Sequence, residues 1–114
     1  MAINTMKDFE LGNGEHIKLT LNFKKLYQLK SSRKDIYDRY NRVQMNGTED
    51  ILDFTLILYT AYLCAQEDMD KVMTEEEFLD ALPPYQNVIV STVMDLTMQK
   101  KAIASEEHSG AKES

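Results

Sequence analysis

The stretch from Ile51 to Gln66, ILDFTLILYTAYLCAQ, constrains the fold more than any other part of this chain. Twelve of its sixteen residues are apolar. As a helix it would be about 24 Å long, which is about the width of a small domain. A helix that is apolar nearly all round must be covered by neighbouring elements. It is too short to span a membrane, and Asp53 lies inside it. We therefore expect a domain built around one central helix.

Length and charge set further bounds. A chain of 114 residues can bury a core without metals or disulfides, and we expect a single domain over residues 1–103. The formal net charge of −6 argues against nucleic acid as the main partner. The single cysteine, Cys64, suits a reducing compartment and is expected to be packed in the core. The N-terminus carries no secretory-signal pattern, so we expect a cytosolic protein without membrane attachment.

One basic cluster interrupts the acidic sequence, and a solvated helix face is its simplest interpretation. An acidic partner surface is the alternative. The cluster consists of Lys24, Lys25, Lys30, Arg33 and Lys34.

Residues 6–21 have the period-two pattern of a β-hairpin with one buried face. Gly12-Asn13-Gly14 supplies a tight turn between the strands. An exposed hairpin edge is also a natural site for self-association, so a homo-oligomer is one expectation. The apolar positions are Phe9, Leu11, Ile17, Leu19 and Leu21.

Residues 23–45 have helical periodicity, interrupted near Ser31. Asn22 is placed to cap the first part, and Ser32 followed by Asp35 resembles a weak capping box that restarts a helix. Gly47 is the residue type favoured just past a helix end. The sequence leaves open whether this segment is one kinked helix or two. The first part carries Phe23, Leu26, Tyr27 and Lys30 at helical spacing, and the second carries Ile36, Tyr37, Tyr40 and Val43.

The central helix is expected over about residues 48–66, starting at Thr48-Glu49-Asp50 with a capping hydroxyl and two acidic residues. Asp53, Thr60 and Glu67 recur every seven residues and predict a narrow polar seam. The simplest interpretation is that this seam is the one wetted edge of the helix. A seam that faces a partner is the alternative.

The segment from Gln66 to Phe78 imitates a calcium-binding loop. Its first position is Gln66 and its sixth is Lys71, where the motif needs an acidic ligand and a glycine, so we expect no calcium site. A polar linker and a helix over about 75–82 are predicted instead, because Thr74 to Glu77 form a full capping box. The apolar face of that helix consists of Phe78, Leu79 and Leu82.

Pro83-Pro84 ends that helix, and a final helix is predicted over about 85–103. The β-branched run from Val88 to Val90 raises a strand alternative, but the length of the segment favours a helix. Residues 104–114 are polar and are expected to be a disordered tail. The predicted inward face of the last helix consists of Tyr85, Val88, Ile89, Val93 and Leu96.

No catalytic, cofactor-binding or metal-binding residues are predicted. The chain has no phosphate-binding glycine loop and no Cys/His cluster, and neither His16 nor His108 has an obvious partner in sequence. A carboxylate-only hydrolase site assembled in three dimensions stays open as an alternative. Seven methionines are many for this length. Core filling is their simplest use, and an adaptable contact surface is the alternative for Met69, Met73, Met94 and Met98.

The order of these features resembles the tail assembly chaperones of long-tailed bacteriophages and prophages of Gram-positive bacteria. The matching segments are GNGEHIKLTLNF, followed directly by FKKLYQL, then ILDFTLILYTAYLCA, and last MTEEEFLDAL before a terminal helix. Together they cover about residues 9–100. The resemblance rests on this pattern, because the family has no set of functional residues that can be carried over.

The resemblance implies a non-enzymatic protein of the host cytoplasm that is absent from the mature virion. Such a protein would bind the tape measure protein and help the tail tube protein assemble around it, and many members also have a longer, frameshifted form. A small acidic regulatory adaptor that binds a host or phage enzyme is the alternative function. From the residues and the resemblance together we expect a mostly α-helical α+β fold. Its N-terminal β-hairpin packs on a bundle of about four to five helices around the central apolar helix.

Overall fold

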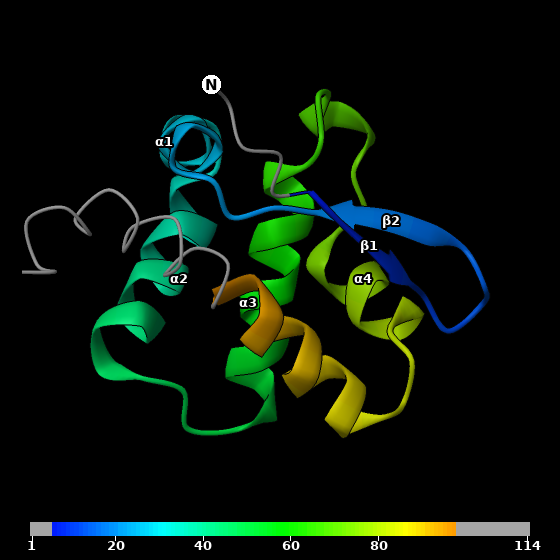
Figure 1. Cartoon of the computed structure of the whole chain (residues 1–114). Helices are drawn as coiled ribbons and strands as arrows, with labels where there is room; N and C mark the ends of the chain where they lie inside the picture. The colour runs from blue at the N-terminus through cyan, green and yellow to red at the C-terminus, as the bar shows by residue number, and fades with distance from the viewer. Residues whose placement is uncertain (1–5, 98–114) are drawn as a thin grey trace, which may run out of the picture.

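The structure is a computed structural model that describes residues 6–97 (Figure 1). It confirms the expected architecture, an N-terminal hairpin packed on helices around a central apolar helix. The predicted residues 98–103 of the last helix and the tail at 104–114 lie outside the described residues. The elements in chain order are β1 (Lys7–Glu10), β2 (His16–Leu19), α1 (Phe23–Ser32), α2 (Lys34–Asn46), α3 (Ile51–Cys64), the 3-10 turn η1 (Met69–Lys71), α4 (Glu75–Ala81) and a final helix described over residues 86–97.

The two strands of the hairpin are antiparallel, with Phe9 opposite Ile17. Gly14 has φ +93° in the turn, a conformation that other residues rarely adopt. β2 lies against α3, and just after it the Thr20 N–H donates to the Ala61 carbonyl at 3.1 Å. The predicted buried face is confirmed, with Ile17 partly covered and the other four positions buried.

Residues 23–46 form two helices, which settles the question that the sequence left open. Asn22 caps α1 as predicted, accepting a hydrogen bond from the Lys25 N–H at 2.9 Å. The predicted capping box from Ser32 to Asp35 is wrong. Ser32 is still helical, so its hydroxyl bonds back to the Gln28 carbonyl at 3.1 Å. Arg33 occupies the break, with φ −139° and ψ 68°.

The central helix α3 begins three residues later than predicted, because Asp50 and not Thr48 is its N-cap. Asp50 accepts from the Leu52 N–H at 2.9 Å, and Asp53 accepts from the Glu49 N–H at 2.7 Å. These carboxylates satisfy N–H groups that have no partner inside the helix. All ten residues from Thr55 to Cys64 are buried, which confirms the position predicted for Cys64.

The predicted wetted seam on α3 is wrong. Thr60 is fully buried, and its hydroxyl donates to the Leu56 carbonyl at 2.8 Å. Glu67 lies beyond the end of α3, and Asp53 belongs to the N-terminal cap. A threonine that bonds back along its own helix has a satisfied hydroxyl, so it needs no contact with water.

Two tyrosines of α3 hold the linker that leads to α4. The Tyr59 hydroxyl donates to the Met73 carbonyl at 2.8 Å, and the Tyr62 hydroxyl accepts from the Met73 N–H at 2.9 Å. Both rings also contact Phe78, and the centre of each lies 5.2 Å from the centre of the Phe78 ring. The predicted capping box of α4 is present between Thr74 and Glu77.

The predicted inward faces of the last two helices are only partly confirmed. Phe78 is fully buried, whereas Leu79 is 37% exposed. Residues 86–97 are helical, which decides against the strand alternative. Tyr85 and Val88 are 62% and 38% exposed, because the helix starts after Tyr85 and its buried stripe is narrower than predicted. The apolar residues of that stripe are Ile89, Val93 and Leu96, and Thr92 is buried beside them.

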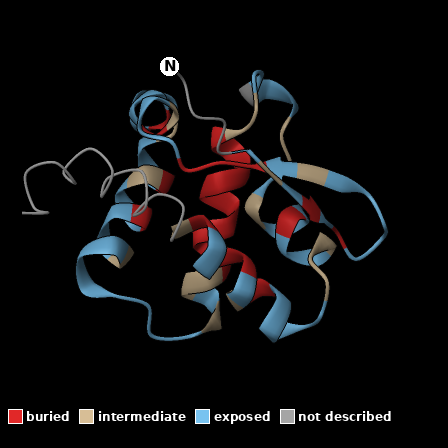
Figure 2. Ribbon diagram, in the orientation of Figure 1, coloured by how far each residue is buried: buried red, intermediate tan, exposed pale blue. Residues whose placement is uncertain are grey.

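Figure 2 shows α3 almost entirely buried at the centre of the fold, while α1 is mostly exposed. Side chains from the hairpin, α1, α2, α4 and the final helix form the core around α3. Within residues 6–97, every buried side-chain nitrogen and oxygen has a hydrogen-bond partner.

Candidate interaction surfaces

The side-chain pairs Asp8–His16 and Arg33–Asp35 are exposed. Within residues 6–97, no group of three or more His, Cys, Asp and Glu side chains could hold a metal ion. A carboxylate active site needs a carboxyl group with a raised pKa. The pKa of Asp8 is lowered by its hydrogen bond from His16, and that of Asp35 is lowered by its hydrogen bond from Arg33. Both shifts run in the opposite direction.

His16 has a partner that the sequence interpretation missed. Its Nδ1 contacts the Asp8 carboxylate, which also accepts a hydrogen bond from the Lys18 ammonium at 3.2 Å. The hydrogen bond and negative charge of Asp8 raise the pKa of His16. The hairpin register could have predicted this contact, because it pairs Asp8 with Lys18 and puts His16 on the same face. All three side chains are exposed, and the arrangement ties the strands together.

A groove of about 280 Å³ runs between α1 and α2. Its α1 side carries Phe23 and Tyr27, which are 59% and 74% exposed. Tyr40 forms part of the lining and is itself buried, and burial raises the pKa of its hydroxyl above the ordinary value. The Lys30 ammonium lies 5.7 Å from the centre of the Tyr37 ring, within cation–π range. The full lining is Phe23, Leu26, Tyr27, Lys30, Tyr37, Tyr40, Asn41 and Gln44.

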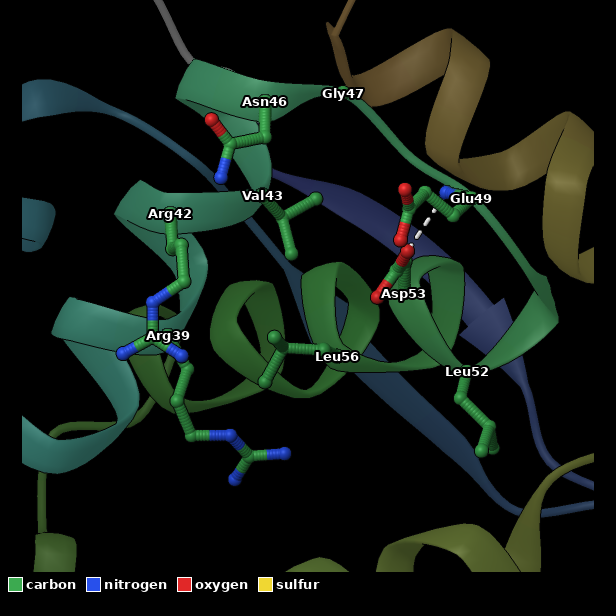
Figure 3. A pocket seen from close by; sticks show the side chains of 9 residues that line it. All are labelled: Arg39, Arg42, Val43, Asn46, Gly47, Glu49, Leu52, Asp53 and Leu56. Atoms are coloured by element: carbon green, nitrogen blue, oxygen red, sulfur yellow. Dashed lines mark hydrogen bonds between the residues drawn. The ribbon is translucent and has the colours of Figure 1, made fainter.

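A second hollow, of about 400 Å³, lies where α2 meets the start of α3 (Figure 3). Arg39 and Arg42 come from α2, and Leu52 and Leu56 come from α3. Arg39 donates two hydrogen bonds to the Glu75 carboxylate, at 2.8 and 3.0 Å, which link α2 to α4. Leu52 is 62% exposed, so an apolar side chain lies beside cationic groups at this site.

A third hollow, of about 490 Å³, lies between β1 and the segment that leads into the final helix. Tyr85 and Val88 form its exposed apolar part. Lys7 and Asp95 form an ion pair across it at 3.4 Å. Gly12 brings the two segments close, because its N–H donates to the Ala81 carbonyl at 2.8 Å and a Cβ there would lie only 3.3 Å from that oxygen.

The structure divides the basic cluster into two groups. Arg33 and Lys34 are each paired with an acidic residue of α2, at 3.3 and 2.7 Å. Within residues 6–97, no ion pair joins Lys24, Lys25 or Lys30 to a carboxylate.

The methionines differ in their burial. Met73 packs against the core, whereas Met94 is 52% exposed. Met98 lies outside the described residues.

The three hollows are open surface features. Among residues 6–97, no helix has the length and apolar character needed to cross a membrane. Comparison of the chain with protein-family models, with curated proteins and with solved structures found no match.

Proposed function

We propose that this protein is a tail assembly chaperone of a long-tailed bacteriophage or prophage. It acts without catalysis in the host cytoplasm, binds the tape measure protein and assists assembly of the tail tube protein around it. It leaves before the virion is complete. The segment pattern described above suggests the family, and the surface supports a binding role.

The observation that carries the proposal is the location of exposed apolar side chains. Nine large hydrophobic residues of the described chain are exposed, and five of them line one of the three hollows. A scattered exposed leucine is normal in a soluble protein, whereas apolar residues gathered at concave surfaces mark contact sites. The five residues are Phe23, Tyr27, Leu52, Tyr85 and Val88.

Co-expression tests the proposal directly. The tape measure protein encoded beside this gene is produced with and without the chaperone, and its soluble fraction is measured. We expect the chaperone to raise that fraction and to co-purify with the tape measure protein, hereafter called the rod. An equally insoluble rod in both cultures contradicts the proposal.

A matched pair of variants sharpens this test. Phe23→Ser with Tyr27→Ser removes two exposed apolar groups from one groove, whereas Met45→Ser removes a side chain that is 79% exposed but lines none of the three hollows. We expect the first variant to lose rod solubilisation and the second to keep it. Gene order separates the chaperone from a regulatory adaptor, because a chaperone gene lies between those of the tail tube and tape measure proteins.

A further inference from the structure

The helix α1 differs in charge from the rest of the molecule. It contains Lys24, Lys25 and Lys30 and no Asp or Glu, whereas the whole chain has a net charge of −6. Three cations that follow in the chain are paired at close range: Arg33 with Asp35, Lys34 with Asp38 at 2.7 Å, and Arg39 with Glu75. The α1 lysines have no such ion pair within residues 6–97. Within residues 6–97 no carboxylate therefore neutralises their positive charge at close range, and the Lys30 ammonium lies over the Tyr37 ring.

The groove beside these lysines is apolar and extends along both helices. Phe23, Tyr27 and Lys30 are spaced i, i+4 and i+7 along α1, and seven helical residues span about 10 Å. Its lining from α2 is Tyr37, Tyr40, Asn41 and Gln44, so no carboxylate of the described residues lines the groove. A volume of about 280 Å³ is below the usual range for a small-molecule site, which starts at about 300 Å³. A shallow groove of this kind suits the apolar side chains of one helical segment.

We infer that the groove between α1 and α2 docks an acidic amphipathic helix of a partner protein. One or two large apolar side chains of that helix pack on Phe23 and Tyr27, and its flanking carboxylates face Lys24 and Lys30. Tyrosine is one of the residue types enriched among energetically dominant contact residues. The inference deepens the proposed function, on which it rests, by naming the chemistry of the segment that the chaperone recognises.

Charge complementarity favours this occupant over a basic one. A basic helix would place its charges against Lys30, which lines the groove, and near Lys24, and within residues 6–97 neither lysine forms an ion pair. A second copy of this chain offers one acidic surface of similar chemistry, since Leu79 of α4 is 37% exposed between the exposed Glu76 and Asp80. Docking of a second copy is therefore a distinct outcome of the test and would contradict a separate partner.

The probe is a fluorescent peptide of about 18 residues, long enough to form a helix, with leucines on one face and glutamates on the other. Fluorescence anisotropy measures its binding to the full chain. We expect the acidic peptide to bind and a matched peptide with lysine in place of glutamate to bind at least about tenfold more weakly. Raising the ionic strength from about 0.05 M to about 0.5 M should weaken the acidic complex.

Two chaperone variants locate the site. Lys24→Glu with Lys30→Glu should weaken peptide binding at least about tenfold, and Tyr27→Ala should weaken it about tenfold. Lys71→Glu is the matched control, since Lys71 is exposed in η1 and does not line the groove. It should bind like the unchanged protein. Circular dichroism and thermal unfolding confirm that each variant is folded.

Equal binding of the acidic and basic peptides, or full binding by the Lys24/Lys30 variant, overturns the inference. So does light scattering that shows a dimer broken by the same variant, combined with no peptide binding, because the occupant is then a second copy. The rod solubilisation experiment gives a separate answer. If the Lys24/Lys30 variant keeps the tape measure protein soluble, the proposed function stands while this docking site fails.

Discussion

The helices α1 and α3 are both rich in aromatic and aliphatic residues, but α3 buries these side chains and α1 leaves its aromatic side chains exposed. In α3, Tyr59 and Tyr62 are 1% and 5% exposed, and both hydroxyls are hydrogen-bonded to Met73. In α1, Phe23 and Tyr27 are 59% and 74% exposed. Only Leu26 and Leu29 of α1 are buried, against ten residues of α3.

This difference separates residues that folding explains from residues that it does not. Burying a large apolar side chain contributes about 1.5–3 kcal/mol to folding, so the composition of α3 follows from its central position. The two aromatics of α1 gain little of that stabilisation. The proposed docking site gives them a role in contacts with another molecule, so substitutions should show opposite effects in the two helices.

The largest effect on stability is expected for Phe78→Ala. Phe78 is fully buried against the two tyrosines of α3, and removing its ring leaves a cavity. We expect a loss of about 3–5 kcal/mol in the free energy of unfolding, measured by chemical denaturation. Leu79→Ala, one position along and 37% exposed, is the control and should cost clearly less. Similar losses for both would mean that α4 does not pack on α3 as described.

A smaller effect is expected for Tyr62→Phe. Without its hydroxyl, the Met73 N–H loses its acceptor at a part-buried position. The expected cost is about 1–2 kcal/mol in the free energy of unfolding. Tyr27→Phe changes the same atoms on the exposed α1 and should leave stability within about 0.5 kcal/mol of the unchanged protein. A comparable loss for both would remove the distinction between the two helices.

The α1 aromatics are expected to show almost no effect on stability. Phe23→Ala and Tyr27→Ala should each change the free energy of unfolding by less than about 1 kcal/mol, because both rings are mostly exposed. The same variants should lose rod and peptide binding. A large loss of stability with unchanged binding would reassign the two rings to the fold.

The smallest expected effect concerns the hairpin. Since the pKa of His16 is raised, the stabilisation from its protonated ring is complete below about pH 6.5 and is lost as the pH rises through the higher folded-state pKa. The lowered pKa of Asp8 makes its contribution disappear as the pH falls through that lower value. NMR titration of His16 should therefore give a lower pKa in Asp8→Asn. An unchanged value would contradict the Asp8–His16 contact.

Local signals predicted the elements well where a residue acts on its own neighbours. Asn22, Gly47 and the pair Thr74–Glu77 each form the cap that their positions indicated. The caps predicted at Ser32 and Thr48 were wrong because a competing hydrogen bond forms at each place. The Ser32 hydroxyl bonds back within α1, and Asp50 caps α3. Such competition depends on the backbone angles of the helix ends, which the order of residues does not fix.

The groove could be predicted only in part. The basic cluster was visible in the sequence. Its separation into residues with and without an ion pair in the described chain depends on the break at Arg33, where α1 ends and α2 begins. The exposure of Phe23 and Tyr27 was not predictable, because helical spacing gives a face and not what covers it. The Asp8–His16 contact likewise depended on the hairpin register.

By itself, the sequence determined that one helix must be central, that a hairpin precedes it and that α4 begins at a capping box. These features follow from apolar content and from hydrogen bonds between near neighbours in the chain. Only the tertiary structure decided that Thr60 is buried, that α3 holds the linker through Met73 and that α1 leaves its aromatics exposed. The reason is that burial and pairing between distant residues depend on how whole elements pack, and a helix periodicity does not encode its neighbours.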